Sequence, residues 1–250
     1  MSASTLRVVL DPAAGPSTLF PVRAQIRAWL QDAGVVGREL DEFVIAIGEA
    51  CANVIEHSGA QAAGGHEAGW IECSADSTHV RVVVRDRGRW RPPDPVADAP
   101  RNRGRGRSIM AALADRMSIS TGSDGTAVEL VKERKVSNTA HGSTEPPAAG
   151  PRLRIERPRA GEVVLAGEID MTQTEALRAE LEAAAGEAAE LLIDLRAVNY
   201  LDSAGVSVLV DQTRRPLRLL VRAGSAVATV ITICGLPGLA QVEFVTPAGP

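Results

Sequence analysis

The stretch Ile47–Ser58, IGEACANVIEHS, decides how the first half of this sequence is interpreted. It closes a segment, residues 39–57, in which large apolar residues recur at the three- and four-residue spacing of a helix. Glu49 and Asn53 are four residues apart, so their side chains lie one above the other on one face. The spacing predicts a long helix that buries an apolar stripe and carries a carboxylate and a carboxamide at the polar edge of that stripe.

Outward from this helix, the pattern predicts an α+β two-layer sandwich. Apolar alternation and turn residues predict a second helix over 18–32, a short helix over 108–115, and strands over 70–75, 79–85, 117–121 and 126–132. The segment 136–151, VSNTAHGSTEPPAAGP, is rich in small residues and proline and is typical of a linker. We therefore expect one domain over residues 1–135 and another over 152–250.

The second half predicts a small α/β domain, because its strands and helices alternate. The expected strands are 153–157, 162–166, 191–195, 217–221 and 242–245, and the expected helices are 172–185, 203–213 and 225–234.

Composition excludes several classes of function. The 250 residues carry a net charge of -4 and 3% aromatic residues, which disfavours nucleic-acid binding by charge or by base stacking. The three cysteines and four histidines show no spacing typical of a disulfide framework or a zinc site. The sequence shows no apolar run of about 20 residues and no apolar core of a signal peptide at its start. We expect a cytoplasmic protein with neither nucleic acid nor membrane as a direct partner.

Glu49 and Asn53 suit two steps of phosphoryl transfer. The amide oxygen of Asn53 is a hard ligand for Mg²⁺, which binds few protein groups together with water and phosphates. The Glu49 carboxylate can accept the proton of an attacking nucleophile. The alternative is a solvated helix face, and the spacing alone favours that alternative.

Three further segments give weaker signals for a nucleotide site. Asp86 and Gly88 follow the strand over 79–85, where a carboxylate can accept a hydrogen bond from an exocyclic amine and glycine lets the backbone approach a base. Gly104 and Gly106 precede a helix, whose first N–H groups can face phosphate. Thr126 opens a strand, where its hydroxyl can reach a purine. Each segment is also explained by an ordinary turn or a flexible loop.

In this order the four segments resemble the GHKL, or Bergerat-fold, ATP-binding domain, specifically its anti-sigma-factor serine/threonine kinase branch. The resemblance covers most of residues 8–133 and implies ATP and Mg²⁺ as ligands. It implies Glu49 as general base and Asn53 as the Mg²⁺ ligand. It further implies a nucleotide-binding set in which Asp86 anchors adenine and the glycines near 105 cover the phosphates: Asn53, His57, Asp86, Gly88, Gly104, Gly106 and Thr126. Trp90 and Arg107 depart from the family pattern.

The second half carries Asp202-Ser203-Ala204-Gly205 between an apolar strand and a helix. Ser203 is placed to cap that helix, and a serine on such a turn can also accept a phosphoryl group. Together with Gly167–Asp170, this motif resembles the STAS domain of anti-sigma-factor antagonists. The resemblance implies that Ser203 is the phosphoacceptor, with Asp170 and Asp202 near it.

The two resemblances together imply an ATP-dependent serine kinase and anti-sigma factor fused to an antagonist-like domain, acting by partner switching. Its partners would be a sigma factor, a STAS-domain antagonist (in its own chain or separate), a serine phosphatase and a second copy of itself. The alternative is a nucleotide-gated binding module without kinase activity, in which the STAS domain serves as a docking surface or internal inhibitor.

Overall fold

The computed structural model describes residues 4–58, 69–87, 104–122, 125–134, 153–186 and 188–246, without the side chains of residues 57 and 58. These residues form two compact units, one built on the sheet of residues 4–133 and one on the sheet of residues 154–245. The predicted linker, 136–151, lies outside the described residues, as do Gly88 and Trp90.

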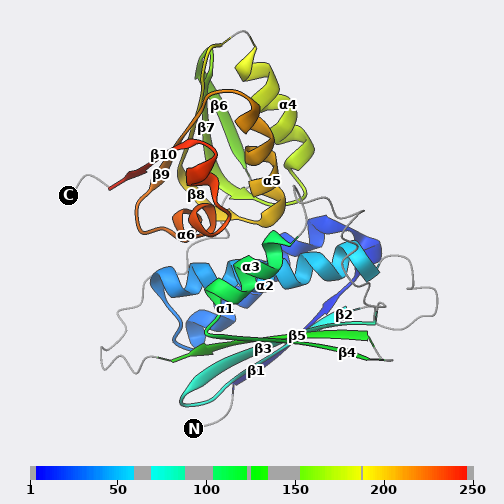
Figure 1. Ribbon diagram of the computed structural model, residues 1–250. Coiled ribbons are helices and arrows are strands. Elements are labelled where there is room, and N and C mark those ends of the chain that lie inside the picture. The colour runs from blue at the N-terminus through cyan, green and yellow to red at the C-terminus, as the bar shows by residue number, and fades with distance from the viewer. Residues whose placement is uncertain are drawn as a thin grey trace. The chain divides into compact units, whose positions relative to one another are not determined.

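The first unit is an antiparallel sheet covered by helices on one face (Figure 1). Its strands lie in the order β1-β2-β3-β5-β4. In chain order, the elements up to residue 133 are β1 (Ser4–Leu10), the 3-10 turns η1 (Pro12–Ala14) and η2 (Pro16–Thr18), α1 (Leu19–Asp32), α2 (Gly37–Ser58), β2 (Gly69–Ala75), β3 (His79–Asp86), α3 (Arg105–Leu113), β4 (Arg116–Gly122) and β5 (Gly125–Glu133).

The core of this unit lies between α2 and the sheet. On α2 the predicted stripe is buried, with Phe43, Ile47 and Cys51 at most 2% exposed. On β3 the alternating residues Val80 and Val82 are fully buried toward the helices. Burial of such side chains supplies the main favourable free energy of folding, so the helix layer and the sheet hold each other in place.

The predicted two-layer α+β sandwich is confirmed, and one strand was missed. Strand β1 pairs with β2 along its whole length, from Ser4 opposite Ala75 to Leu10 opposite Gly69. The two strands are more than fifty residues apart in the sequence, so no local sequence pattern could predict that they pair. Helix α3 also begins at Arg105, three residues before the predicted start.

The second unit is a mixed five-stranded sheet in the order β10-β9-β8-β7-β6, in which only β6 and β7 are antiparallel. Its elements are β6 (Arg154–Arg159), β7 (Glu162–Ile169), α4 (Thr174–Ala185), β8 (Leu191–Leu201), α5 (Ser203–Asp211), η3 (Gln212–Arg214), β9 (Leu217–Arg222), α6 (Ala226–Ile233), η4 (Leu236–Gly238) and β10 (Gln241–Val245). The predicted small α/β domain is confirmed.

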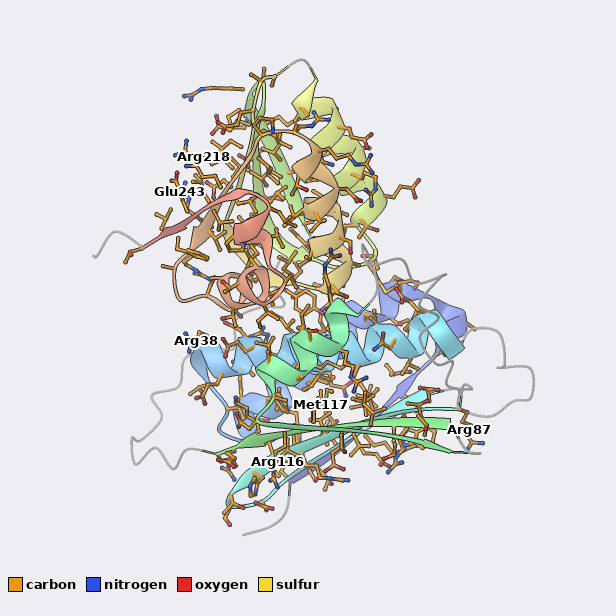
Figure 2. All side chains as sticks on the ribbon, viewed as in Figure 1. Arg38, Arg87, Arg116, Met117, Arg218 and Glu243 are labelled. Carbon is orange, nitrogen blue, oxygen red and sulfur yellow. The ribbon has the colours of Figure 1, made fainter. Side chains whose placement is uncertain are left out.

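The central strands of this unit are apolar and buried, with Val163, Ile193 and Leu219 fully covered. At the edge, the Nε of Arg218 donates to Glu243 of β10 at 2.8 Å (Figure 2). Strand β8 extends to Leu201, well beyond the predicted end at residue 195, and pairs with β7 as far as Ile169. The carboxyl ends of β7 and β8 therefore meet at Asp170 and Asp202.

Candidate functional site

Helix α2 holds Glu49 and Asn53 one turn apart, as predicted. Glu49 is only 2% exposed and Asn53 is half-buried. The alternative of a solvated helix face is therefore wrong, and Glu49 lies deeper than the polar edge at which the sequence pattern placed it. A buried carboxylate is retained only with polar partners, so this position is built for a charged or hydrogen-bonded role. His57 lies in the same helix, but its side chain is outside the described residues.

The ends of three strands bring Asp86 and Thr126 together. Asp86 is the register partner of Gly69 on β2 and of Thr126 on β5. Gly125 has φ +119° and comes so close to β3 that a Cβ there would lie 1.8 Å from the Asp86 carbonyl oxygen. Only glycine fits this approach. The threonine hydroxyl and the aspartate consequently sit on neighbouring strand ends, and Thr126 is 8% exposed.

A packing contact places these strand ends against α2. A Cβ on Gly69 would lie 2.4 Å from Cγ1 of Val54, the residue that follows Asn53. The turn of α2 that carries Asn53 therefore lies at the end of β2, next to the strand ends that carry Asp86 and Thr126. The sequence pattern placed Val54 in the buried stripe of the helix, where it is 2% exposed, but did not predict its contact with Gly69. The glycine directly before an apolar strand was the available signal.

The glycines near residue 105 lie at the start of α3. Gly104 has φ +104° and precedes α3, and its carbonyl oxygen accepts from the backbone N–H of Ser108 at 3.3 Å. Gly106 lies inside the first turn of α3, not before it, because the helix begins at Arg105. Arg107 is exposed on the same helix.

In the second unit, Ser203 is the first residue of α5, and Asp202 caps the helix. The Asp202 Oδ1 accepts from the backbone N–H of Gly205 at 2.8 Å. The expectation that Ser203 is the cap is therefore wrong. The Asp202 carboxylate accepts from the third N–H of the helix, which makes Asp202 the N-cap residue. Ser203 is half-buried and occupies the first helical position after it.

Asp202 also joins this turn to its neighbour. Its Oδ2 accepts from the backbone N–H of Met171 at 3.1 Å, in the turn that follows β7. Asp170 shapes that turn from within, because its Oδ1 accepts from both the backbone N–H and the hydroxyl of Thr172. The structure thus brings Asp170, Asp202 and Ser203 to one end of the sheet, as predicted.

Gly205 allows α5 to pack directly on the sheet end. A Cβ there would lie 2.7 Å from Ile169 Cγ2 and from Leu201 Cδ1, and both of these side chains are fully buried. The glycine of the Asp-Ser-Ala-Gly motif is therefore explained by close packing.

Two family models match the chain. Residues 13–132 match the histidine kinase-like ATPase domain, and residues 154–242 match a STAS domain described as "Mlab, STAS domain". The chain is a histidine kinase-like ATPase domain followed by a STAS domain. An ATPase domain of this kind implies ATP as a ligand.

Three solved structures match parts of the chain. The RsbU and RsbW domains of Rv1364c from Mycobacterium tuberculosis match with 26% identity and a TM-score of 0.41 over 55% of this chain and 35% of that chain. The unphosphorylated anti-sigma factor antagonist SpoIIAA matches with 20% identity and a TM-score of 0.31, over 37% of this chain and 88% of its own. A histidine kinase domain from Erythrobacter litoralis EL346 gives the same identity and TM-score over 46% of this chain and 60% of that one. This chain thus spans about a third of the Mycobacterium tuberculosis structure.

Two of the predicted site residues in the ATPase domain have side chains of the chemical type that binds a magnesium nucleotide. Asn53 supplies a hard oxygen and Asp86 a hydrogen-bond acceptor. Within the described ranges, no group of three or more His, Cys, Asp or Glu side chains could hold a metal ion by itself. A magnesium ion would therefore take most of its ligands from phosphates and water.

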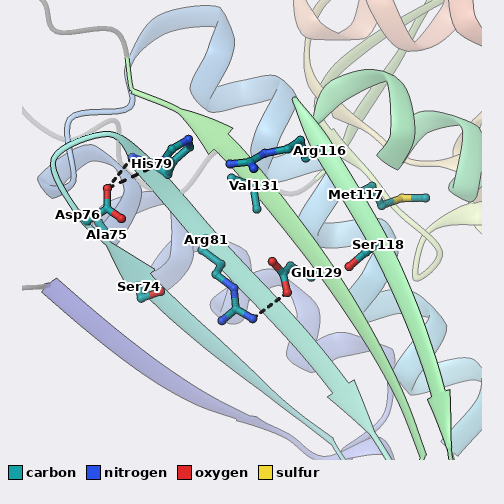
Figure 3. A pocket seen from close by; sticks show the side chains of 10 residues that line it. All are labelled: Ser74, Ala75, Asp76, His79, Arg81, Arg116, Met117, Ser118, Glu129 and Val131. Atoms are coloured by element: carbon teal, nitrogen blue, oxygen red, sulfur yellow. Dashed lines mark hydrogen bonds and ion pairs between the residues drawn. The ribbon is translucent and has the colours of Figure 1, made fainter.

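A separate hollow of about 650 Å³ lies on the outer face of the ATPase sheet (Figure 3). It is lined by Arg81, Glu129 and Arg116 among others, and the Arg81 guanidinium donates to Glu129 at 2.7 Å. It lies toward the His79 end of β3, whereas Asp86 ends that strand. The predicted nucleotide residues therefore do not line it.

In the described parts of the chain, no helix is both long and apolar enough to cross a membrane.

Proposed function

We propose that this chain is an ATP-dependent protein serine kinase and anti-sigma factor, fused to an antagonist-like STAS domain and acting by partner switching. The kinase would transfer the γ-phosphoryl group of ATP to a STAS-domain serine, in this chain Ser203. The observation that carries the proposal is the grouping of a buried Glu49 and Asn53 on α2 with Asp86 and Thr126 on the adjoining strand ends.

In this proposal Asn53 holds Mg²⁺ through its amide oxygen and Asp86 accepts a hydrogen bond from the adenine amine. Thr126 lies beside Asp86 to contact the same base. His57 and the glycines Gly88, Gly104 and Gly106 would contact or cover the phosphates.

Glu49 is the proposed general base. It would accept the proton of the serine hydroxyl while the serine oxygen forms a bond to the γ-phosphorus and the bond from that phosphorus to ADP breaks. The low exposure of Glu49 suits this role, since a carboxylate shielded from water interacts more strongly with a nearby proton donor.

Ser203 is the proposed acceptor because it is half-buried at the start of α5 and follows the capping Asp202. The phosphorylated side chain would carry a charge of about −1.5 to −2 beside that carboxylate. Such a change of charge is large enough to alter binding between an antagonist and its kinase. Unphosphorylated STAS domain would hold the kinase, and phosphorylation would free the kinase to bind a sigma factor.

The cycle requires a sigma factor, a STAS domain in the same or a separate chain, and a serine phosphatase that resets Ser203. A second copy of the chain is a further proposed partner. The proposed domain limits are residues 1–135 for the kinase and 152–250 for the STAS domain.

The test is intact-mass measurement of the full chain after incubation with ATP and Mg²⁺. We expect one added phosphate on the wild type, none on Ser203→Ala, and none on Glu49→Gln. Glu42→Gln is the matched control, because it makes the same change in α2, where Glu42 pairs with Arg38 at 3.4 Å. It should retain phosphorylation.

The same experiment, with binding measured by calorimetry, separates the alternative. ATP binding that is lost in Asn53→Ala, without phosphate transfer to this chain or to added STAS-domain proteins, would show a nucleotide-gated binding module instead of a kinase. No binding of ATP at all would refute both functions.

A further inference from the structure

The Asp202 carboxylate makes two hydrogen bonds to two different segments of the STAS domain. One oxygen accepts from Gly205 N–H in the first turn of α5, at 2.8 Å, and the other accepts from Met171 N–H in the turn after β7, at 3.1 Å. Asp202 is 3% exposed, so both bonds are shielded from competition with water. Bonds from backbone N–H to a carboxylate are also stronger than those between neutral groups.

These two bonds have different requirements. Capping needs only one acceptor oxygen on a short side chain, and asparagine and serine cap about as well as aspartate. The bond to Met171 needs a second acceptor on the same side chain. Asparagine offers an NH₂ group there, which cannot accept from an N–H donor, and serine is too short to span both segments.

The turn that receives the second bond is itself well formed. Asp170 Oδ1 accepts from the Thr172 N–H at 2.9 Å, and Gln173 Oε1 accepts from the Asp170 N–H at 2.9 Å. Asp202 therefore links the start of α5 to a braced turn and not to a loose loop. Ser203 directly follows this linked residue, and its carbonyl oxygen accepts from the Ser207 hydroxyl at 2.9 Å.

We propose that Asp202 is a positioning residue for Ser203, and that its bridge to Met171, beyond its capping of α5, orients the serine hydroxyl for phosphorylation. This inference rests on the proposed function, because it assumes that Ser203 accepts a phosphoryl group. Without the bridge the helix remains capped and the backbone N–H of residue 202 still donates to the Ile169 carbonyl oxygen at 3.2 Å, but the side-chain link between the two turns is lost and the hydroxyl is held less firmly. A displacement of about 1 Å at a reacting atom is enough to lower the rate of transfer, and the domain can still fold.

The experiment compares the full chain with Asp202→Asn and Asp202→Ser, which keep a cap and remove the bridge. Asp211→Asn is the matched control, since it removes a carboxylate from the last residue of α5, where Asp211 pairs with Arg178. Backbone amide hydrogen exchange reports the bridge, and the rate of phosphate addition to Ser203 at varied ATP·Mg²⁺ reports its effect.

We expect both bridge variants to exchange the Met171 amide proton faster while the Gly205 proton stays protected. Their kcat for phosphorylation should fall about tenfold with an unchanged KM for ATP, because the nucleotide residues belong to the other domain. Asp211→Asn should keep the wild-type kcat.

The outcomes separate the two proposals. Wild-type kcat in Asp202→Asn, together with fast exchange at Met171, would overturn the positioning role and leave the kinase function standing. Unchanged exchange at Met171 would overturn the bridge. A wild-type chain that binds ATP but never gains phosphate on Ser203 would overturn the proposed function, and the positioning role with it.

Discussion

Replacing Gly69 by alanine tests whether the contact between β2 and α2 builds the nucleotide site. The new Cβ would lie 2.4 Å from Val54 Cγ1 and 3.0 Å from the carbonyl oxygen of Arg85. Ordinary van der Waals contact begins at about 3.5 Å, so Val54 must retreat by about 1 Å. Asn53 precedes Val54 on α2 and would move with it, away from the strand end that carries Asp86.

The magnitude follows from packing. Overfilling a packed core costs about 1–3 kcal/mol, and alanine recovers about 0.5–1 kcal/mol relative to glycine in a strand. We therefore expect Gly69→Ala to lower the free energy of unfolding of the ATPase domain by about 1–2 kcal/mol. Val54 is 2% exposed, and Val54→Ala should lower it by about 2 kcal/mol through lost methyl groups and the cavity that they leave.

The double variant, Gly69→Ala with Val54→Ala, tests whether the two residues are in contact. The Cβ added at position 69 fits the space that Val54 Cγ1 vacates. Independent effects would sum to about 3–4 kcal/mol, whereas we expect about 2 kcal/mol, a favourable coupling of about 1 kcal/mol or more. Urea unfolding of the full chain measures these differences, and ATP calorimetry should show weakened binding in Gly69→Ala and recovery in the double variant.

Gly122→Ala is the control, since a Cβ there meets no atom within 4 Å. It should raise the free energy of unfolding by at most about 0.5–1 kcal/mol, as alanine does in a strand, and leave ATP binding unchanged. Additive free energies in the double variant would refute the contact as the source of the effect.

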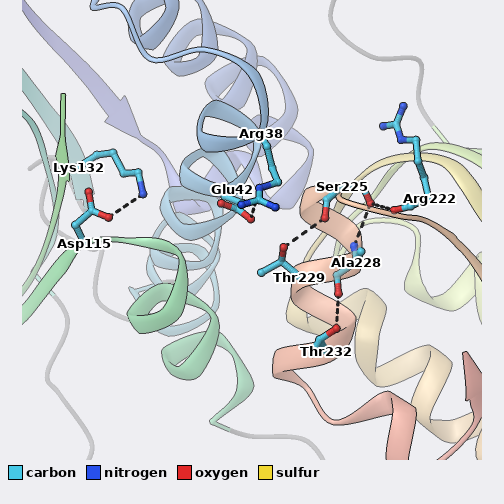
Figure 4. A network of polar contacts seen from close by, with 9 residues as sticks. All are labelled: Arg38, Glu42, Asp115, Lys132, Arg222, Ser225, Ala228, Thr229 and Thr232. Carbon is cyan, nitrogen blue, oxygen red and sulfur yellow. Dashed lines mark hydrogen bonds and ion pairs between the residues drawn. The ribbon is translucent and has the colours of Figure 1, made fainter. Parts of the chain in front are cut away.

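Three further predictions concern other contacts. Hydrogen bonds from Thr78, the backbone N–H first, lower the pKa of Asp76 from 3.8 to about 2. The ionised carboxylate therefore stabilises the fold fully above pH 3.8, and this contribution is lost as the pH falls toward 2. Carboxyl-carbon NMR titration should give a midpoint near 2, and a midpoint near 3.8 would contradict the prediction. Burial raises the pKa of two thiols to about 12, those of Cys51 and Cys73. A disulfide reagent at pH 8 should therefore modify half-buried Cys234 quickly and the other two only after unfolding, and three fast thiols would refute this. The Nζ of Lys132 donates to the Asp115 carboxylate at 2.9 Å (Figure 4). Asp115→Ala removes this partner and should lower the free energy of unfolding, measured in urea, by about 2 kcal/mol. Asp115→Asn keeps an acceptor oxygen and should lower it by less.

The sequence by itself determined the secondary structure around the site and the order of its motifs. The spacing of Glu49 and Asn53 on a helix, and of the apolar stripe beside them, depends on contacts within one or two turns. Helical and strand periodicity are therefore visible in a single segment. The predicted elements of both domains formed close to their expected positions for this reason, with errors mainly at their ends.

Only the tertiary structure decided which of these segments meet. The approach of Gly69 to Val54, the close pairing of Gly125 with Asp86, and the pairing of β1 with β2 join residues between 15 and 71 positions apart. Asp202, and not the predicted Ser203, caps α5, because β8 continues to Leu201 and places the Asp202 carboxylate between two turns. Such contacts depend on how whole layers pack, and that information is spread over the chain and absent from any one stretch of it.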